Sequence, residues 1–196
     1  MSAPDALPRA EDVGVAIGFC RAEVTELAAL RGRVPELERI AASRGLRLPP
    51  TGHAVVTSDA LVLSVRPERW LLVTSPAPAG ATADNWRVLG VGAAAAVDQS
   101  AGLAVLQLAG SNVREVLARG CRLDLAADSF ASGRAAATSM AQVATILVAV
   151  TSGVLILTPA STARHLHEWL STTARPFGLA ARGHVSVSTL FGQQDS

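Results

Sequence analysis

The second of the chain's two cysteines lies beside charged residues, an arrangement that can create a reactive thiol. Cys121 stands in the run LARGCRLDL, with Arg122 next to it and Asp124 close by. A neighbouring guanidinium lowers the pKa of a thiol, whereas the negative end of a helix dipole raises it. Gly120 is expected to end the preceding helix in a left-handed conformation, so Cys121 follows a helix C-terminus. We therefore predict a structural cysteine, with Asp124 as a turn or cap residue and Arg122 as an interface candidate.

The four histidines are spaced in a way that argues against a metal site. His165 and His167 fall at i, i+2 of a predicted helix and so point about 200° apart. Zinc ligands on helices are separated by three or four positions. His53 and His184 each stand alone near a predicted strand start, and no third ligand is evident. We expect a solvated or interface histidine pair and no metal.

Two further patterns resemble catalytic or cofactor motifs but are incomplete. Asp98 and Ser100 could form a nucleophile–acid pair, yet the sequence places no histidine to complete a triad. The run VDQSAGL is instead typical of a strand-ending turn. Gly90 and Gly92 lack the third glycine of a dinucleotide-binding turn and the strand that must precede it. We therefore expect no catalytic and no cofactor-binding residue in this chain.

The composition of the 196 residues excludes several classes of function. There is no Lys and no Tyr, so a Schiff-base lysine and a tyrosine general acid are excluded. The net charge is +1, aromatic residues make up 4% and no basic block occurs, so nucleic-acid binding is not predicted. Hydrophobic residues reach 49%. Such a chain has either an Ala-rich core or a surface hidden against a partner.

The cysteines and the apolar stretches indicate a cytoplasmic protein with no membrane segment. Cys20 and Cys121 are far apart and in no CxxC context, which fits a reducing compartment. The N-terminal run MSAPDALPRAED lacks the basic start and apolar core of a signal peptide. The apolar run VATILVAVTSGVLIL is too short to cross a bilayer, and Thr151-Ser152-Gly153 interrupts it. Two buried strands around a tight turn are the better interpretation.

Apolar periodicity predicts an α+β fold. Residues 1–50 are expected to form an N-terminal helical extension, with AEVTELAAL and PELERIAASRG as its helices. HAVVT, ALVLSVRP and RWLLVTSP are predicted strands, followed by a short helix over Ala83–Leu89. The second half, from AAAAVDQS to STARHLHEWLSTTARPFG, has the order β-β-α-β-β-β-α. The tail after Gly183 can add one edge strand.

A faint internal repeat indicates a duplicated unit. LLVTSPAPAGATADNW aligns with VLILTPASTARHLHEW, so that Pro76 matches Pro159 and Trp86 matches Trp169. We predict one α+β domain over residues 51–183, with pseudo-repeats at 51–92 and 93–176, and a tail at 184–196. The three tryptophans, Trp70 included, are expected to anchor core or interface packing. Trp86 and Trp70 are the interface candidates among them.

Four segments resemble the gamma subunit of heterotetrameric sarcosine oxidase. They are RPERWLLV (66–73), VDQSAGLAVLQLAGSNVREVLARGCRLDL (97–125), FASGRAAAT (130–138) and HEWL (167–170). The run from Leu117 to Leu125 is the most specific of them. The resemblance covers roughly residues 60–175, and residues 1–50 match poorly.

The resemblance implies a fold and a role. The gamma subunit is similar in fold to the folate-binding aminomethyltransferases, a duplication of β-β-α-β-β-β-α units. It implies a small non-catalytic subunit whose partners are the alpha, beta and delta subunits. FAD, FMN, NAD, zinc and tetrahydrofolate then belong to those partners, and this chain binds none of them. The complex is expected to N-demethylate an N-methyl amino acid oxidatively, giving formaldehyde or methylene-tetrahydrofolate.

Two alternatives of other classes remain open from the sequence. A free-standing folate-binding one-carbon transferase would need a pterin pocket with a carboxylate and a general acid. A homo-oligomeric binding domain would bury the apolar surface against copies of itself. Solubility of the chain expressed alone distinguishes them, because an obligate hetero-subunit is expected to aggregate.

Overall fold

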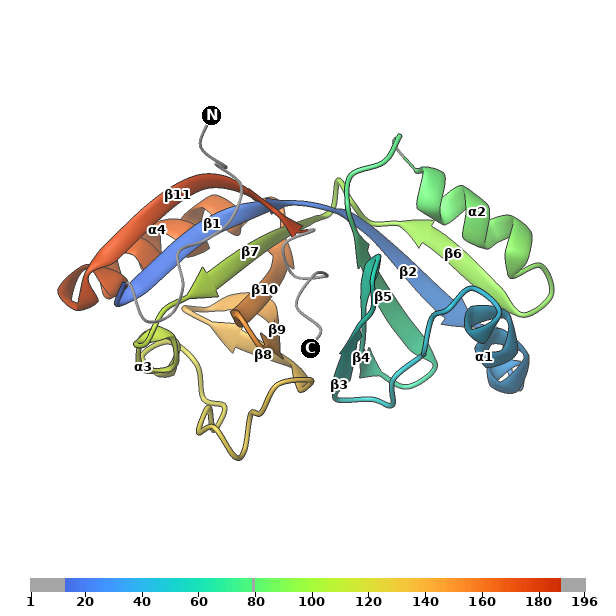
Figure 1. The fold of residues 1–196 in the computed structure, drawn as a ribbon, viewed down its shortest axis with the longest axis horizontal. Coiled ribbons are helices and arrows are strands. Elements are labelled where there is room, and N and C mark those ends of the chain that lie inside the picture. The colour runs from blue at the N-terminus through green and yellow to red at the C-terminus, as the bar shows by residue number, and fades with distance from the viewer. Residues whose placement is uncertain (1–12, 79, 188–196) are drawn as a thin grey trace.

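The computed structural model describes residues 13–78 and 80–187, which form two facing β-sheets with helices on both outer sides (Figure 1). Sheet A has six strands in the order β11-β1-β7-β10-β9-β8, and sheet B has five in the order β3-β4-β5-β2-β6. The strands of sheet A are β1 (Val15–Arg21), β7 (Leu103–Ala109), β8 (Ala135–Met140), β9 (Val143–Val150), β10 (Gly153–Pro159) and β11 (Leu179–Ser186). Those of sheet B are β2 (Glu23–Ala29), β3 (His53–Val56), β4 (Ala60–Arg66), β5 (Arg69–Thr74) and β6 (Ala94–Asp98). The helices are α1 (Val34–Ala42), α2 (Ala81–Leu89), α3 (Val113–Ala118), α4 (Ala163–Ala174) and the 3-10 turn η1 (Arg175–Phe177).

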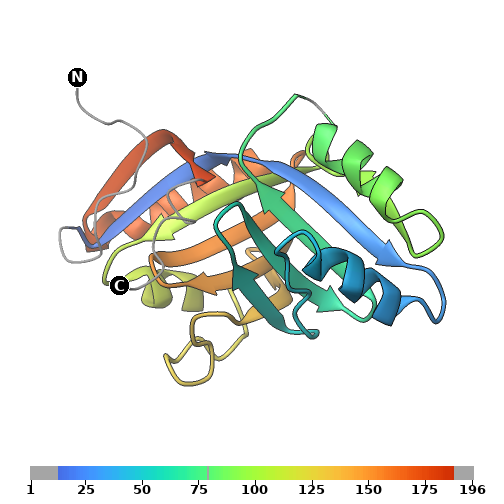
Figure 2. The same ribbon diagram turned by 45° about the vertical axis from the view of Figure 1, so that its right-hand side comes forward.

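The same order of elements occurs twice, as the predicted duplicated β-β-α-β-β-β-α fold class requires. The first unit runs from β1 to α2, the second from β6 to α4, and β11 follows as an edge strand. The first strand of each unit pairs in the sheet of the other unit, β1 beside β7 and β6 beside β2. Figure 2 shows β1 running on into β2 from one sheet to the other. This exchange of strands ties the two halves together.

The predicted N-terminal helical extension over residues 1–50 is wrong for much of its described part. Residues 15–29 form strands β1 and β2, and only α1 is helical. The segment AEVTELAAL is rich in good helix formers, but β2 is covered on both faces. Val24 packs between the sheets and Leu27 packs under the helices of sheet B. Burial in a central strand overrides local helix propensity here.

The unit boundaries shift accordingly. The predicted pseudo-repeat at 51–92 covers only the later part of the first unit, because β1, β2 and α1 precede it. β6 begins at Ala94 and α4 ends at Ala174, inside the second predicted pseudo-repeat at 93–176. β11 is the expected edge strand, but it begins at Leu179 and pairs in parallel with β1. Most of the predicted tail at 184–196 lies outside the described residues.

The apolar run at 143–157 forms two antiparallel strands, β9 and β10, as predicted. Gly153 begins β10 with a φ of 136°, and a Cβ there would lie 2.0 Å from the carbonyl oxygen of Leu108. Only glycine permits this close approach of β10 to β7. Within the described ranges, no helix is long and apolar enough to span a membrane.

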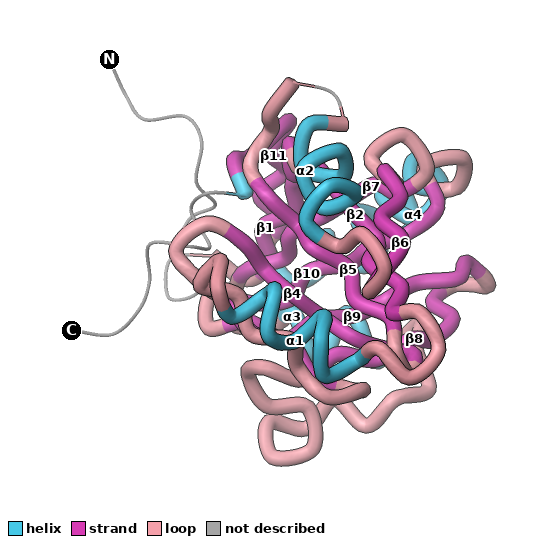
Figure 3. Tube along the Cα trace, turned by 90° about the vertical axis from the view of Figure 1, so that its right-hand side faces the viewer, coloured by secondary structure: helices cyan, strands magenta, loops and turns pink. Residues whose placement is uncertain are grey.

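Three apolar clusters hold the four layers together. Along β5 the side chains alternate: Leu71 and Val73 point between the sheets, while Trp70 and Leu72 point toward α1 and α2. Figure 3 shows these two helices on the same face of sheet B. A third cluster joins α3 and α4 to sheet A. Each fully buried Leu or Val contributes about 1.5–3 kcal/mol to folding.

Short backbone contacts also join the sheets along one side. The amide of Ala54 donates to the carbonyl of Gly133 at 2.8 Å, and the amide of Ala135 donates to the carbonyl of Gly52 at 2.9 Å. β3 and β8 are the terminal strands of their sheets, so these bonds close that side of the sandwich. The bonds thus join the starts of β3 and β8, which are the corresponding strands of the two units.

Candidate functional site

Cys121 lies directly after α3 and is enclosed by its neighbours. Cys121 is 9% exposed and forms an isolated β-bridge with Met140. The Leu123 amide lies 3.4 Å from Sγ and the Thr138 hydroxyl lies 3.7 Å from it. These are the contacts of a packed side chain. The other cysteine, Cys20, is also desolvated, and burial raises the pKa of its thiol to about 12.

Gly120 is not the left-handed helix stop that the sequence predicts. It does not adopt the left-handed conformation expected of a helix stop. Instead, the indole of Trp169 packs directly on it, and a Cβ at Gly120 would lie 2.3 Å from Cη2 of that ring. Glycine is therefore required at this position because α4 packs closely against the end of α3. No local sequence pattern predicts this long-range contact.

Asp124 is a turn residue, as predicted. Its carboxylate accepts hydrogen bonds from the Ser129 hydroxyl and from the Ala126 amide. These two bonds, the hydroxyl first, lower the pKa of the carboxyl group below its usual value. Arg114 of α3 donates to two carbonyl oxygens of the same loop, at 2.6 and 3.0 Å. Asp124 and Arg114 therefore organise the loop that follows Cys121.

Asp98 and Ser100 form the strand-ending turn that the sequence predicts. The Ser100 hydroxyl and amide donate to Oδ1 of Asp98 at 2.6 and 2.9 Å, which lowers the pKa of that carboxyl group. The Val24 amide donates to the same hydroxyl at 3.0 Å. Gly90 and Gly92 lie between α2 and β6, at a helix C-terminus, where the dipole is unfavourable for phosphate.

The four histidines do not form one cluster, although two of them share an aromatic neighbour. His167 of α4 stacks on Phe19 of β1, with ring centroids 5.0 Å apart, and His184 of β11 lies on the same ring at 6.2 Å. His53 contacts Arg134 across the β3–β8 joint, at 3.0 Å. His165 is exposed. In the part of the chain that the structure describes, no three His, Cys, Asp or Glu side chains gather as metal ligands.

Two of the three interface candidates lie in the core of the chain. Trp70 is 6% exposed, and its indole donates to the Pro49 carbonyl at 2.8 Å. Trp86 is 5% exposed in the same cluster. Little of either ring is left for a partner. Arg122 is exposed and lines a surface cavity, and its role at an interface stays a prediction.

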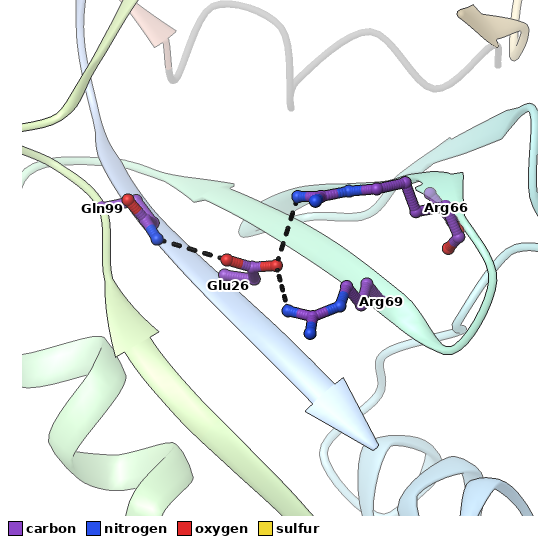
Figure 4. A network of polar contacts seen from close by, with 5 residues as sticks. Glu26, Arg66, Arg69 and Gln99 are labelled. Carbon is purple, nitrogen blue, oxygen red and sulfur yellow. Dashed lines mark hydrogen bonds and ion pairs between the residues drawn. The ribbon is translucent and has the colours of Figure 1, made fainter. Parts of the chain in front are cut away.

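A polar network that the sequence did not reveal lies on sheet B (Figure 4). Glu26 of β2, with a side chain 12% exposed, accepts from Arg69 at 2.9 Å and from Arg66 at 3.5 Å. Gln99 donates to its other oxygen at 3.2 Å. Both arginines flank the tight turn at Pro67. The only sequence signal was this pair of arginines in RPERW, because the acceptor is distant in the chain.

Two cavities occupy corresponding places in the two units. Both include residues of a short repeated motif that follows the unit's first helix, RGLRL at 44–48 and RGCRL at 119–123. Both also include the next hairpin turn and the matching tryptophan, Trp86 in one and Trp169 in the other. Their volumes are about 530 Å³ in the first unit and about 720 Å³ in the second. The duplication has thus produced a pair of related surface sites.

The charges of the two cavities differ. The first is lined by Arg44 and Asp59, and its Thr82 donates at 2.6 Å to the buried carboxylate of Glu23. The second is lined by Arg119 and Arg122, with no Asp or Glu among its lining residues. The cavity of the second unit is therefore the more cationic of the two.

Comparison with known proteins identifies the family. Residues 37–174 match the sarcosine oxidase, gamma subunit family. The chain belongs to this family. No curated protein sequence was found to match it.

Two solved structures are similar in fold to this member of the gamma subunit family. A chain of the heterotetrameric sarcosine oxidase from Corynebacterium sp. U-96, in complex with pyrrole 2-carboxylate, is 29% identical with a TM-score of 0.74. The match covers 85% of this chain and 86% of that one. The glycine cleavage system aminomethyltransferase T from Bartonella henselae is 15% identical with a TM-score of 0.64, covering 86% of this chain and 47% of that one. This second likeness shows the folate-binding aminomethyltransferase fold alone.

Proposed function

We propose that this chain is the gamma subunit of a heterotetrameric sarcosine oxidase-type complex, assembled with alpha, beta and delta subunits. The observation that carries the proposal is the match to a chain of such an enzyme over nearly the full length of both, at 29% identity and a TM-score of 0.74. Because the shared length is almost complete on both sides, the resemblance extends over a whole subunit.

The chain is proposed to have no active site of its own. The pair that resembled catalytic residues, Asp98 and Ser100, is engaged in a turn. Between the sheets pack apolar side chains, among them Val24, Leu63 and Leu155. The Glu26 carboxylate, on the same face of β2 as Val24, is already bound by Arg66, Arg69 and Gln99. FAD, FMN, NAD, zinc and tetrahydrofolate are accordingly assigned to the other subunits, where oxidative N-demethylation of an N-methyl amino acid takes place in the cytoplasm.

Exposed apolar side chains support the role of a subunit. Four large ones lie around α2 and strands β2 and β6: Leu30, Val88, Val91 and Val97, exposed by 44%, 76%, 76% and 45%. Exposed apolar side chains of this kind occur at protein–protein contacts. Val88 is on α2 and Val91 follows it, while Leu30 follows β2 and Val97 is on β6, so the part of the molecule formed by sheet B and α2 is the better candidate for an apolar contact.

Affinity purification from the native host tests this proposal. The tagged chain is expected to retain three further subunits, and the eluate is expected to be yellow from bound flavin. Demethylation of sarcosine and of other N-methyl amino acids by that eluate then identifies the substrate. A colourless eluate containing the tagged chain alone contradicts the proposal and favours folate binding or self-association.

A further inference from the structure

We infer that the cavity lined by Arg119, Arg122 and Trp169, here called the Arg122 cavity, binds a carboxylate side chain on an acidic segment of a partner subunit. The inference rests on the proposed function, since it names one contact within the assembly. It adds a specific charged contact beside α3 and β8, apart from the exposed apolar residues of α2, β2 and β6.

The charge of the cavity is the first argument. Within the described part of the chain, Arg122 is exposed and makes no hydrogen bond or ion pair. Arg119 is only loosely engaged, with Nη2 3.6 Å from the Glu115 carboxylate and its guanidinium over the ring of Phe177. No acidic residue lines the cavity. Two guanidinium groups without a full carboxylate partner form a site for an external carboxylate.

The neutral donors beside the arginines fit the same ligand. Thr138 and Ser139 of β8 and Gln142 of the following turn line the cavity together with Arg122. Hydroxyl and amide groups of this kind donate to the lone pairs that an arginine fork leaves free on a carboxylate. The ring of Trp169 adds an apolar wall against which the methylene groups of an Asp or Glu side chain can pack.

A strained turn forms part of the lining. Ala141 and Gln142 have φ values of 48° and 67°, which L-amino acids adopt only at a cost. A two-residue hairpin turn of this kind normally carries Asn-Gly. Residues with side chains stand here instead, and both line the cavity. Backbone strain of this kind clusters at functional sites.

The openness of the cavity favours a polypeptide over a free anion. Arg122, Ser139 and Gln142 are exposed. Thr138 and Trp169 are half-buried. An exposed ion pair is weakened by water and salt, so a small anion gains little. A segment that covers the arginines excludes water from the pair and strengthens it.

Charge reversal in the co-expressed complex tests the inference, with the repeated motif supplying the control. Arg122→Glu is expected to lower the recovery of partner subunits with the tagged chain about tenfold, and Arg122→Gln by less. Arg47→Glu reverses the corresponding exposed arginine of RGLRL, which does not line the first cavity, and is expected to change recovery by less than about twofold. Thermal unfolding of each variant chain is expected to be unchanged, since both side chains are exposed.

The outcomes separate the inference from the proposed function. If the wild-type chain recovers its partners and Arg122→Glu recovers them equally well, the inference is overturned while the proposed function stands. The same holds if inorganic phosphate binds the wild-type chain but not Arg122→Glu and assembly is unaffected, because the cavity is then a small-anion site. If the wild-type chain recovers no partner, both are overturned.

Discussion

The two units of the chain have the same scaffold but different surfaces. Both contain the same order of strands in their sheets, and both have a tryptophan at the same place on the second helix. Trp86 is buried in the core of the first unit, whereas Trp169 is half-buried at the rim of the Arg122 cavity. The difference teaches that duplication retained what the fold requires, while the segments after α1 and α3 diverged into two distinct sites.

Replacing each tryptophan separately is expected to give the largest losses of stability. Comparison of the two losses tests the difference in burial. Trp86→Ala is expected to lower the free energy of unfolding by about 4 kcal/mol, because it removes a ring that is only 5% exposed from a core cluster. Trp169→Ala is expected to cost about half as much, since that ring already contacts solvent. Urea unfolding of the two variants checks the order. Equal losses would show that both rings play the same part in the fold.

The two motif glycines are the next comparison. Gly120→Ala is expected to destabilise by about 2–3 kcal/mol, because the new Cβ collides with the ring of Trp169. Gly45→Ala meets no atom within 4 Å, and its cost of about 1 kcal/mol comes only from a φ of 70°. Combining Gly120→Ala with Trp169→Ala is expected to recover much of the loss. A double variant that is fully additive would disprove the collision.

The hairpin turns of the two units differ in strain. Gln142→Gly is expected to stabilise the chain by about 0.5–1 kcal/mol, because glycine adopts the φ of 67° without strain. The matched change in the first unit, Ser58→Gly, is expected to give no gain. That turn has no positive φ and is held by the Thr57 hydroxyl, which accepts from the Ala60 amide at 3.1 Å. Melting temperatures of both variants measure the contrast.

The turn from β6 to β7, which connects the two sheets, is sensitive to acid, and this is the smallest expected effect. Hydrogen bonds from Ser100 lower the pKa of the Asp98 carboxyl group in the folded state below its ordinary value. Their contribution to stability is therefore present above the unfolded pKa and is lost as the pH falls through the folded pKa. Asp98→Asn is expected to reduce the decrease in melting temperature between neutral pH and about pH 3. An unchanged pH profile would show that Asp98 does not stabilise this turn.

The strands and helices of the second unit could be predicted because their local signals agree with their environment. Apolar runs bounded by Gly and Pro become β9 and β10, and the matched tryptophans identified the repeat. β1 and β2 could not be predicted in the same way. The Ala, Glu and Leu residues of β2 favour a helix locally, and β1 pairs in the sheet of the other unit, a long-range pairing that no local pattern reveals.

The polar sites show the same limit. The turn at Asp98 and Ser100 involves near neighbours in the chain, so its bonds could be predicted from the pattern. Glu26 is bound by residues far away in the sequence, and pairing across such a distance depends on the sheet register. The packing of Trp169 on Gly120 depends likewise on where α4 crosses α3.

Native mass spectrometry of the assembly purified through this chain tests the central claim most directly. The account predicts a complex that contains one copy of this chain with three different partner subunits, and loss of flavin absorbance when the chain is removed by immunodepletion. A mass equal to this chain alone, or to a multiple of it, would contradict the account.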